Sequence, residues 1–181
     1  VVITEPCDAD SRIYDLFPST NSPIVINEVS PNNQEHDEDP NDIGLDRFED
    51  WIELYNTSNA TVDIGGLNLS DQKAELGRFT FPDGTTIAAR DFIVVWADDD
   101  VGEVGFHTNF KLSKSGESVL LSDANFQILD AISYPKTSKD ISYARVPDGT
   151  GDFYRHDPPT IGAANSNDQE TKCTITYTEG E

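Results

Sequence analysis

Carboxylates crowded into one segment are the groups in this chain best placed for chemistry. Between Glu35 and Asp50 the sequence holds eight acidic residues and a single arginine. Calcium takes roughly six to eight hard oxygen ligands from carboxylates, amide carbonyls and backbone carbonyls. A divalent ion would relieve the mutual repulsion of these carboxylates, so the segment is a candidate calcium-binding loop. The first expected ligands are Asp37, Asp39, Asp42 and Asp46.

A second acidic run follows the most apolar segment of the chain. Asp98, Asp99 and Asp100 come directly after residues 92–97, and Glu103 is close behind. Asp98 and Asp100 are therefore the second pair of expected calcium ligands. The alternative for both runs is a solvated acidic loop without a bound ion, because charge runs are usually solvated surface.

The first acidic run is not an EF-hand. Asp37, Asp39 and Asn41 have the spacing of the first three EF-hand ligands. The sixth position, which requires glycine, is Asp42, and the twelfth position is Phe48. Any calcium site here is expected to have an irregular set of ligands.

Catalytic motifs are missing from the sequence. It contains no Gly-x-Ser-x-Gly motif and no glycine-rich phosphate-binding loop. Ser70 and Lys73 fit Ser-x-x-Lys, but a pattern with two fixed positions occurs by chance. The three histidines, His36, His107 and His156, lack the spacing of a transition-metal site, and His107 is expected to decorate a strand or loop. We therefore expect no enzymatic activity.

The charge of the chain narrows its possible partners. Twelve basic and 34 acidic residues give a formal net charge of −22 over 181 residues. Nucleic acids are bound by neutralising phosphates with Lys and Arg, so this chain is not expected to bind them. Its acidity suits cations, a basic partner or simply solubility. No run of about 18 apolar residues exists, so membrane insertion is not expected.

The two ends of the chain suggest a larger parent protein. The sequence begins at Val1 and contains no methionine, so we expect an excerpt or a processed product. Cys7 and Cys173 lie near opposite ends. In an extracellular protein they could form a disulfide that joins the termini. The alternatives are free thiols or partners in neighbouring domains.

Hydrophobic patterning predicts an all-β protein. Residues 51–55 alternate as a half-buried strand does, whereas residues 92–97 are continuously apolar, which predicts a central strand covered on both faces. Further strands are expected at 24–29, 62–64, 79–81, 85–88, 119–122, 128–134 and 142–146. Turn residues separate these segments and no helical period is sustained, which favours an antiparallel sandwich or barrel.

Three zones are expected along the chain. Residues 1–22 are a linker or the end of an upstream module, 23–165 form the domain, and 166–181 are a tail or the start of another domain. Seven segments of the middle zone resemble, in order, those of the lamin tail domain family. The most recognisable runs from Asp50 to Asn56, and the others are 24–29, 66–71, 79–85, 110–117, 142–149 and 159–165.

The resemblance implies an Ig-like antiparallel β-sandwich without agreed catalytic residues. In bacteria such domains are appended to secreted or cell-surface proteins, which implies an extracellular accessory module that positions or docks neighbouring domains. Loops 34–50 and 98–109 are the expected contact sites, because binding residues concentrate on loops. Unlike the nuclear members, this chain is strongly acidic and lacks a heptad pattern, so filament assembly and chromatin binding are not implied.

The alternative function is carbohydrate binding, because sandwiches often host it. Exposed aromatic rings usually stack on sugars, and Trp51, Tyr55 and Tyr143 could supply them. The same three side chains also fit packing within the core or against a strand face. The sequence thus leaves both functions open.

Overall fold

Strands are the regular secondary structure of the residues that the structure describes. The computed structural model describes residues 2–6, 14–15, 21–41, 48–166 and 172–176. Within these ranges no helix occurs, and so none is long and apolar enough to cross a membrane. The all-β expectation is confirmed.

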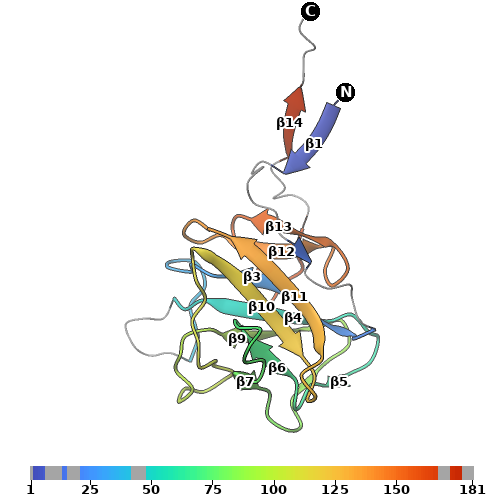
Figure 1. Cartoon of the computed structure of the whole chain (residues 1–181), viewed down its shortest axis with the longest axis vertical. Coiled ribbons are helices and arrows are strands. Elements are labelled where there is room, and N and C mark those ends of the chain that lie inside the picture. Colours follow the sequence, from blue (N-terminus) through green and yellow to red (C-terminus); the bar gives the residue numbers. More distant parts are fainter. Residues whose placement is uncertain (1, 7–13, 16–20, 42–47, 167–171, 177–181) are drawn as a thin grey trace, which may run out of the picture.

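Two five-stranded antiparallel sheets form the body of the molecule (Figure 1). The first has the strand order β13–β12–β3–β4–β9. Its strands are β3 (Ile24–Ser30), β4 (Trp51–Asn56), β9 (Phe92–Trp96), β12 (Ser142–Val146) and β13 (Asp152–His156). The second has the order β2–β11–β10–β6–β7. Its strands are β2 (Tyr14–Asp15), β6 (Asn68–Ser70), β7 (Phe79–Thr80), β10 (Gly116–Ser122) and β11 (Ile128–Pro135).

Two short pairs complete the strands. β5 (Val62–Asp63) pairs with β8 (Thr86–Ile87), and β1 (Val2–Pro6) pairs with β14 (Lys172–Thr176). The second pair sets the backbone of Glu5 opposite Cys173. Cys7 lies outside the described residues, so the disulfide stays a prediction.

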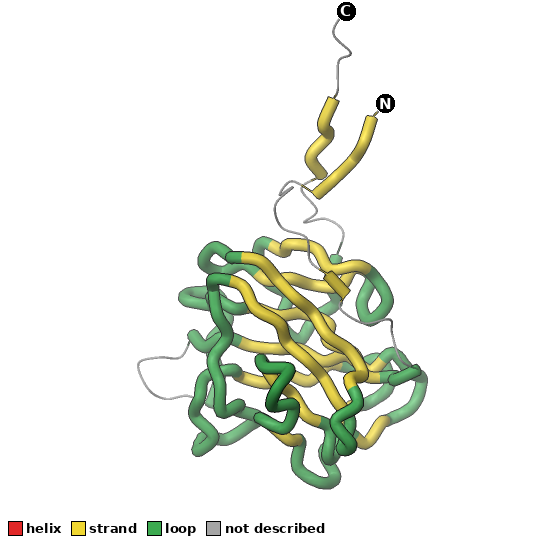
Figure 2. The backbone as a smooth tube through the Cα atoms, viewed as in Figure 1, coloured by secondary structure: helices red, strands yellow, loops and turns green. Residues whose placement is uncertain are grey.

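The hydrophobic core lies between the two large sheets, whose strands cross one in front of the other in Figure 2. Ile26 and Leu54 come to this core from the first sheet, and Leu121 and Ile132 come from the second. All four side chains are fully buried. Apolar area removed from water contributes roughly 25 cal/mol per Å², so this layer is the main source of the sandwich's stability.

A buried ion pair joins the two sheets at a bulge in β3. The ladder between β3 and β4 shifts register between Ile26 and Glu28. Asp130 of β11 accepts a hydrogen bond from the Ile26 N–H at 2.7 Å, and Arg145 of β12 donates to the Ile26 carbonyl at 2.9 Å. Arg145 also donates to both oxygens of Asp130, at 2.9 and 3.2 Å. The pair therefore satisfies backbone groups beside the bulge.

The position predicted for β9 within its sheet is wrong. Residues 92–97 were expected to form a central strand, but β9 is the edge strand beside β4. Phe92, Ile93 and Val94 are accordingly only half-buried. The chain after β9 turns back and bridges its end, where Trp96 pairs with His107 in parallel. The continuous apolar run reflects this local cover as well as the core.

The expected half-exposure of β4 is also wrong, since all six of its residues are buried. Non-local segments cover its outer face. Trp51 donates to Asp37 of the loop before β4, and Glu53 accepts a hydrogen bond from the Gly162 N–H. Alternation in sequence marks two faces, but it does not reveal whether a distant loop covers the second face.

Most of the expected strand positions are confirmed, and four strands were not expected, namely β1, β2, β6 and β13. The first two lie in residues 1–22, which were expected to be a linker or the end of an upstream module. β6 has only three residues, which is too few for a periodic signal. In β13 the two aromatic residues, Phe153 and Tyr154, are adjacent rather than alternating, and Phe153 is its buried apolar side chain.

Candidate metal centre

Four potential metal ligands converge where two loops meet beside the end of β9. Asp39 lies in the loop between β3 and β4, whereas Asp98, Glu103 and His107 lie in the segment that follows β9. Each offers one ligand atom, and these atoms lie within 4.8 Å of one another. The cluster thus unites one member from each of the two acidic runs.

Backbone pairing places His107 in the cluster. Trp96 donates its N–H to the Phe106 carbonyl at 2.8 Å, and Thr108 donates to the Trp96 carbonyl at 2.8 Å. These bonds hold the segment around His107 against the end of β9. Gly105 has a φ of 131°, and a Cβ there would lie 3.1 Å from His107 Nε2. Glycine therefore serves both the backbone conformation and the close approach of the imidazole ring.

Both ring nitrogens of His107 face oxygen atoms. Nδ1 lies 2.5 Å from Asp98 Oδ2, and Nε2 lies 3.3 Å from the Val104 carbonyl oxygen and 3.5 Å from Asp39 Oδ2. A neutral imidazole has one N–H and one lone pair, so it cannot donate on both sides. The surroundings therefore suit either a protonated ring or a cation at Nε2.

Asp39 supplies the unsatisfied group of the cluster. Its Oδ1 accepts a hydrogen bond from the Asn41 N–H at 2.8 Å. Its Oδ2 is buried and has no hydrogen-bond partner among the described residues, and the residue is 1% exposed. Buried carboxylate oxygens are nearly always hydrogen-bonded or bound to a metal, because desolvation of an unpaired charge is costly.

The electrostatics at His107 follow from its acidic neighbours. Burial by itself lowers the pKa of the imidazole, but the hydrogen bond and charge of Asp98 raise it, with help from the Val104 carbonyl and Asp39. The net effect raises the pKa above its ordinary value of 6.5. The site therefore favours positive charge at this position, whether from a proton or from a metal ion.

The other expected calcium ligands lie elsewhere or outside the described residues. Asp37 is directed to Trp51 Nε1 at 3.2 Å and to His36 Nδ1 at 2.8 Å. Asp100 is exposed, and its Oδ1 accepts a hydrogen bond from the Gly102 N–H at 3.2 Å. Asp42 and Asp46 lie outside the described residues. Of the six expected ligands, Asp39 and Asp98 enter the cluster.

Expecting His107 merely to decorate a strand or loop was wrong. Its side chain is 1% exposed and contacts two carboxylates. A usable signal did exist, because His107 follows an acidic run at the end of a strong strand. A loop that returns to such a strand brings the two together, but a lone histidine has no ligand spacing that would reveal this.

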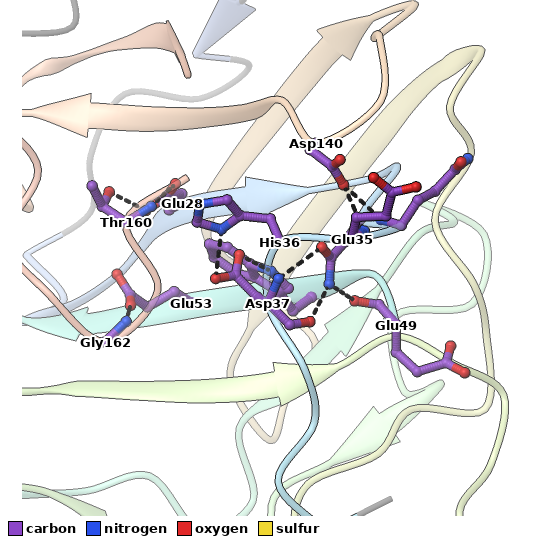
Figure 3. Close-up of polar contacts among 12 residues, drawn as sticks. Glu28, Glu35, His36, Asp37, Glu49, Glu53, Asp140, Thr160 and Gly162 are labelled. Atoms are coloured by element: carbon purple, nitrogen blue, oxygen red, sulfur yellow. Dashed lines mark hydrogen bonds and ion pairs between the residues drawn. The ribbon is translucent and has the colours of Figure 1, made fainter. Parts of the chain in front are cut away.

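Hydrogen bonds hold the loop that carries Asp39 (Figure 3). The Asn33 amide donates to the carbonyl oxygens of Asp37, at 2.5 Å, and Glu49, at 2.9 Å, and so ties the two sides of the loop together. Asp140, from the turn before β12, accepts hydrogen bonds from the backbone N–H groups of Gln34 and Glu35. The first half of this loop is therefore fixed without any ion.

A second group of buried acids lies on the outer face of the first sheet, where Figure 3 shows Glu28 and Glu53 beside Thr160 and Gly162. Glu28 accepts hydrogen bonds from the Thr160 N–H at 3.0 Å and hydroxyl at 2.7 Å. Glu53 accepts from the Gly162 N–H at 2.7 Å and from Asn27 at 3.0 Å. Burial raises the pKa of Glu53 from 4.5 to about 8 and also raises that of Glu28. These carboxyls fasten the segment after β13 onto the sheet.

Comparison with known proteins gives one family. The model of the Lamin Tail Domain matches residues 18–136, which is more than half of the chain. No curated protein matches the sequence. The matched range ends before β12 and β13, although both strands are hydrogen-bonded into the first sheet.

Proposed function

The chain belongs to the lamin tail domain family, and on that premise we propose that it docks a neighbouring domain of a secreted or cell-surface protein. Members of this family are Ig-like, non-enzymatic domains, which implies an interaction role. The proposed contact is the segment between Asp98 and His107, which is part of the expected contact loop 98–109. The observation that supports this surface is its pair of exposed valines. Val101 is 70% exposed and Val104 is 77% exposed.

The chemistry of the docking partner follows from the surroundings of the valines. Asp99 and Asp100 are exposed on the same segment, and the whole chain carries a formal charge of −22. Two apolar side chains beside acidic groups suit an apolar hollow bordered by Lys and Arg. Complementary charge speeds association and selects the partner, while the buried apolar contact supplies affinity.

Carbohydrate binding now lacks the residues that suggested it. Trp51 is 0% exposed, Tyr143 is 3% exposed and Tyr55 is 9% exposed. A ring buried to this extent offers no face for stacking on a sugar. The carbohydrate alternative stays a prediction, with no aromatic platform among these three residues.

The test measures binding between this chain and the remaining domains of its parent protein by isothermal titration calorimetry. The double variant Val101→Asp with Val104→Asp should weaken binding at least about tenfold, which is 1.4 kcal/mol. Phe126→Asp is the matched control, because Phe126 is 55% exposed but lies in the β10–β11 turn. Equal losses in the two variants, or no binding by the wild type, would overturn the proposal.

A further inference from the structure

We propose that Asp39, Glu103 and His107 bind a first-row divalent transition-metal ion such as Zn²⁺, with Asp98 orienting His107, and that this ion fastens the loop between β3 and β4 to the segment after β9. This proposal does not depend on the docking function. It starts from Asp39 Oδ2, a buried carboxylate oxygen that no described residue hydrogen-bonds. That oxygen faces His107 Nε2 across 3.5 Å, a separation at which a hydrogen bond is very weak.

The spacing of these two atoms fits ligands of a common ion. Zinc bonds to histidine nitrogen and to carboxylate oxygen are about 2.0–2.2 Å long. In a tetrahedral site such bonds set neighbouring ligand atoms about 3.3–3.6 Å apart. The 3.5 Å between Asp39 Oδ2 and His107 Nε2 lies within that range.

Asp98 is placed to orient the histidine. A metal-binding imidazole usually donates its other ring N–H to a carboxylate, which fixes the tautomer and the direction of the lone pair. With the proton on Nδ1, His107 donates to Asp98 Oδ2 at 2.5 Å, and its Nε2 lone pair faces Asp39. The Val104 carbonyl oxygen, 3.3 Å from Nε2, is a further oxygen near the ion.

Charge also favours a metal ion over a proton. The cluster holds three carboxyl groups, and a divalent ion brings two positive charges into this largely buried site, whereas a proton on His107 brings one. An imidazole nitrogen suits zinc, whereas calcium prefers a shell made only of oxygen. Calcium, which the sequence predicted for the two acidic runs, is therefore the ion whose affinity is compared with that of zinc.

The experiment uses the whole chain, stripped with EDTA and dialysed, and titrates Zn²⁺, Mn²⁺, Ca²⁺ and Mg²⁺ by calorimetry with parallel thermal melts. We expect one Zn²⁺ or Mn²⁺ per chain. At a hundredfold excess over Kd the ion should raise Tm by roughly 5–11 °C. Asp39→Asn and His107→Gln should each weaken this binding at least about tenfold.

Asp99→Asn is the matched control, because Asp99 is exposed, lies in the same segment and is not part of the cluster. It should change Kd by less than about twofold. Glu103→Gln serves as a further ligand variant should His107→Gln fail to fold, because Glu103 is only half-buried. Circular dichroism of each metal-free variant checks the fold.

Three results would overturn the proposal. The first is that no ion binds, in which case a protonated His107 accounts for the cluster. The second is that Ca²⁺ binds more tightly than Zn²⁺ and Mn²⁺ and the affinity survives His107→Gln. The third is that Asp99→Asn weakens binding as much as Asp39→Asn does, which would indicate diffuse attraction to acidic loops.

Discussion

Removing Asp130 should destabilise the sandwich more than any change to a surface carboxylate. Asp130 is 4% exposed and Arg145 is 6% exposed. Asp130→Ala deletes the acceptor of two hydrogen bonds from the guanidinium and of the 2.7 Å bond from the Ile26 N–H. Arg145 keeps its bonds to the carbonyls of Ile26 and Gly151 and its stacking on Phe153, but it loses the buried carboxylate of Asp130.

The magnitude follows from the cost of an uncompensated buried charge. Breaking a buried ion pair by removing one partner costs about 3–5 kcal/mol. For a domain near this size each kcal/mol lowers Tm by about 2–4 °C, so Tm should fall by roughly 6–20 °C. Urea unfolding followed by circular dichroism, in EDTA so that no ion contributes, gives the free energy of unfolding directly.

Two further variants make the Asp130 test specific. Asp152→Ala removes an exposed carboxylate from β13 and should change the free energy of unfolding by no more than about 0.5 kcal/mol. Arg145→Met in the Asp130→Ala background removes the guanidinium that has lost Asp130, so the double variant should lose less than the sum of the single losses. A loss below about 1 kcal/mol for Asp130→Ala would refute the inference that this pair joins the two sheets.

Two other predictions concern the outer face of the first sheet. Because burial raises the pKa of Glu53 from 4.5 to about 8, its contribution to stability is fully present below pH 4.5 and is lost as the pH rises through about 8. The free energy of unfolding of the wild type, minus that of Glu53→Gln, should fall by up to about 5 kcal/mol over this window, and a flat difference would contradict the shift. Trp51→Phe removes the indole N–H that donates a hydrogen bond to Asp37 Oδ2 at 3.2 Å. The free energy of unfolding, measured with denaturant, should fall by about 1–3 kcal/mol. An unchanged midpoint would show that water replaces the indole N–H as the donor to Asp37.

Local pattern was sufficient for the class of the fold. The alternation in residues 51–55 and the glycine- and proline-rich turns predict strands regardless of what packs on them, because side chains of a strand point alternately to its two faces. Nine expected strand segments overlap strands of the structure. The pattern could not order them, since hydrogen bonding between strands depends on partners far away in sequence. The edge position of β9 and the cover over β4 are both of this kind.

The candidate metal centre divides in the same way. The sequence by itself determined that the acidic candidate ligands gather in two runs, one before β4 and one after β9, and that Asp39 and Asp98 are among them. Only the tertiary structure decided that these two meet, that His107 joins them and that Asp37 and Asp100 do not. The physical reason is that a cation site is defined by ligand atoms a few ångströms apart, whereas sequence records only separation along the chain. The segment after β9 folds back onto Trp96, and this brings residues that are separated along the chain to within a few ångströms of one another.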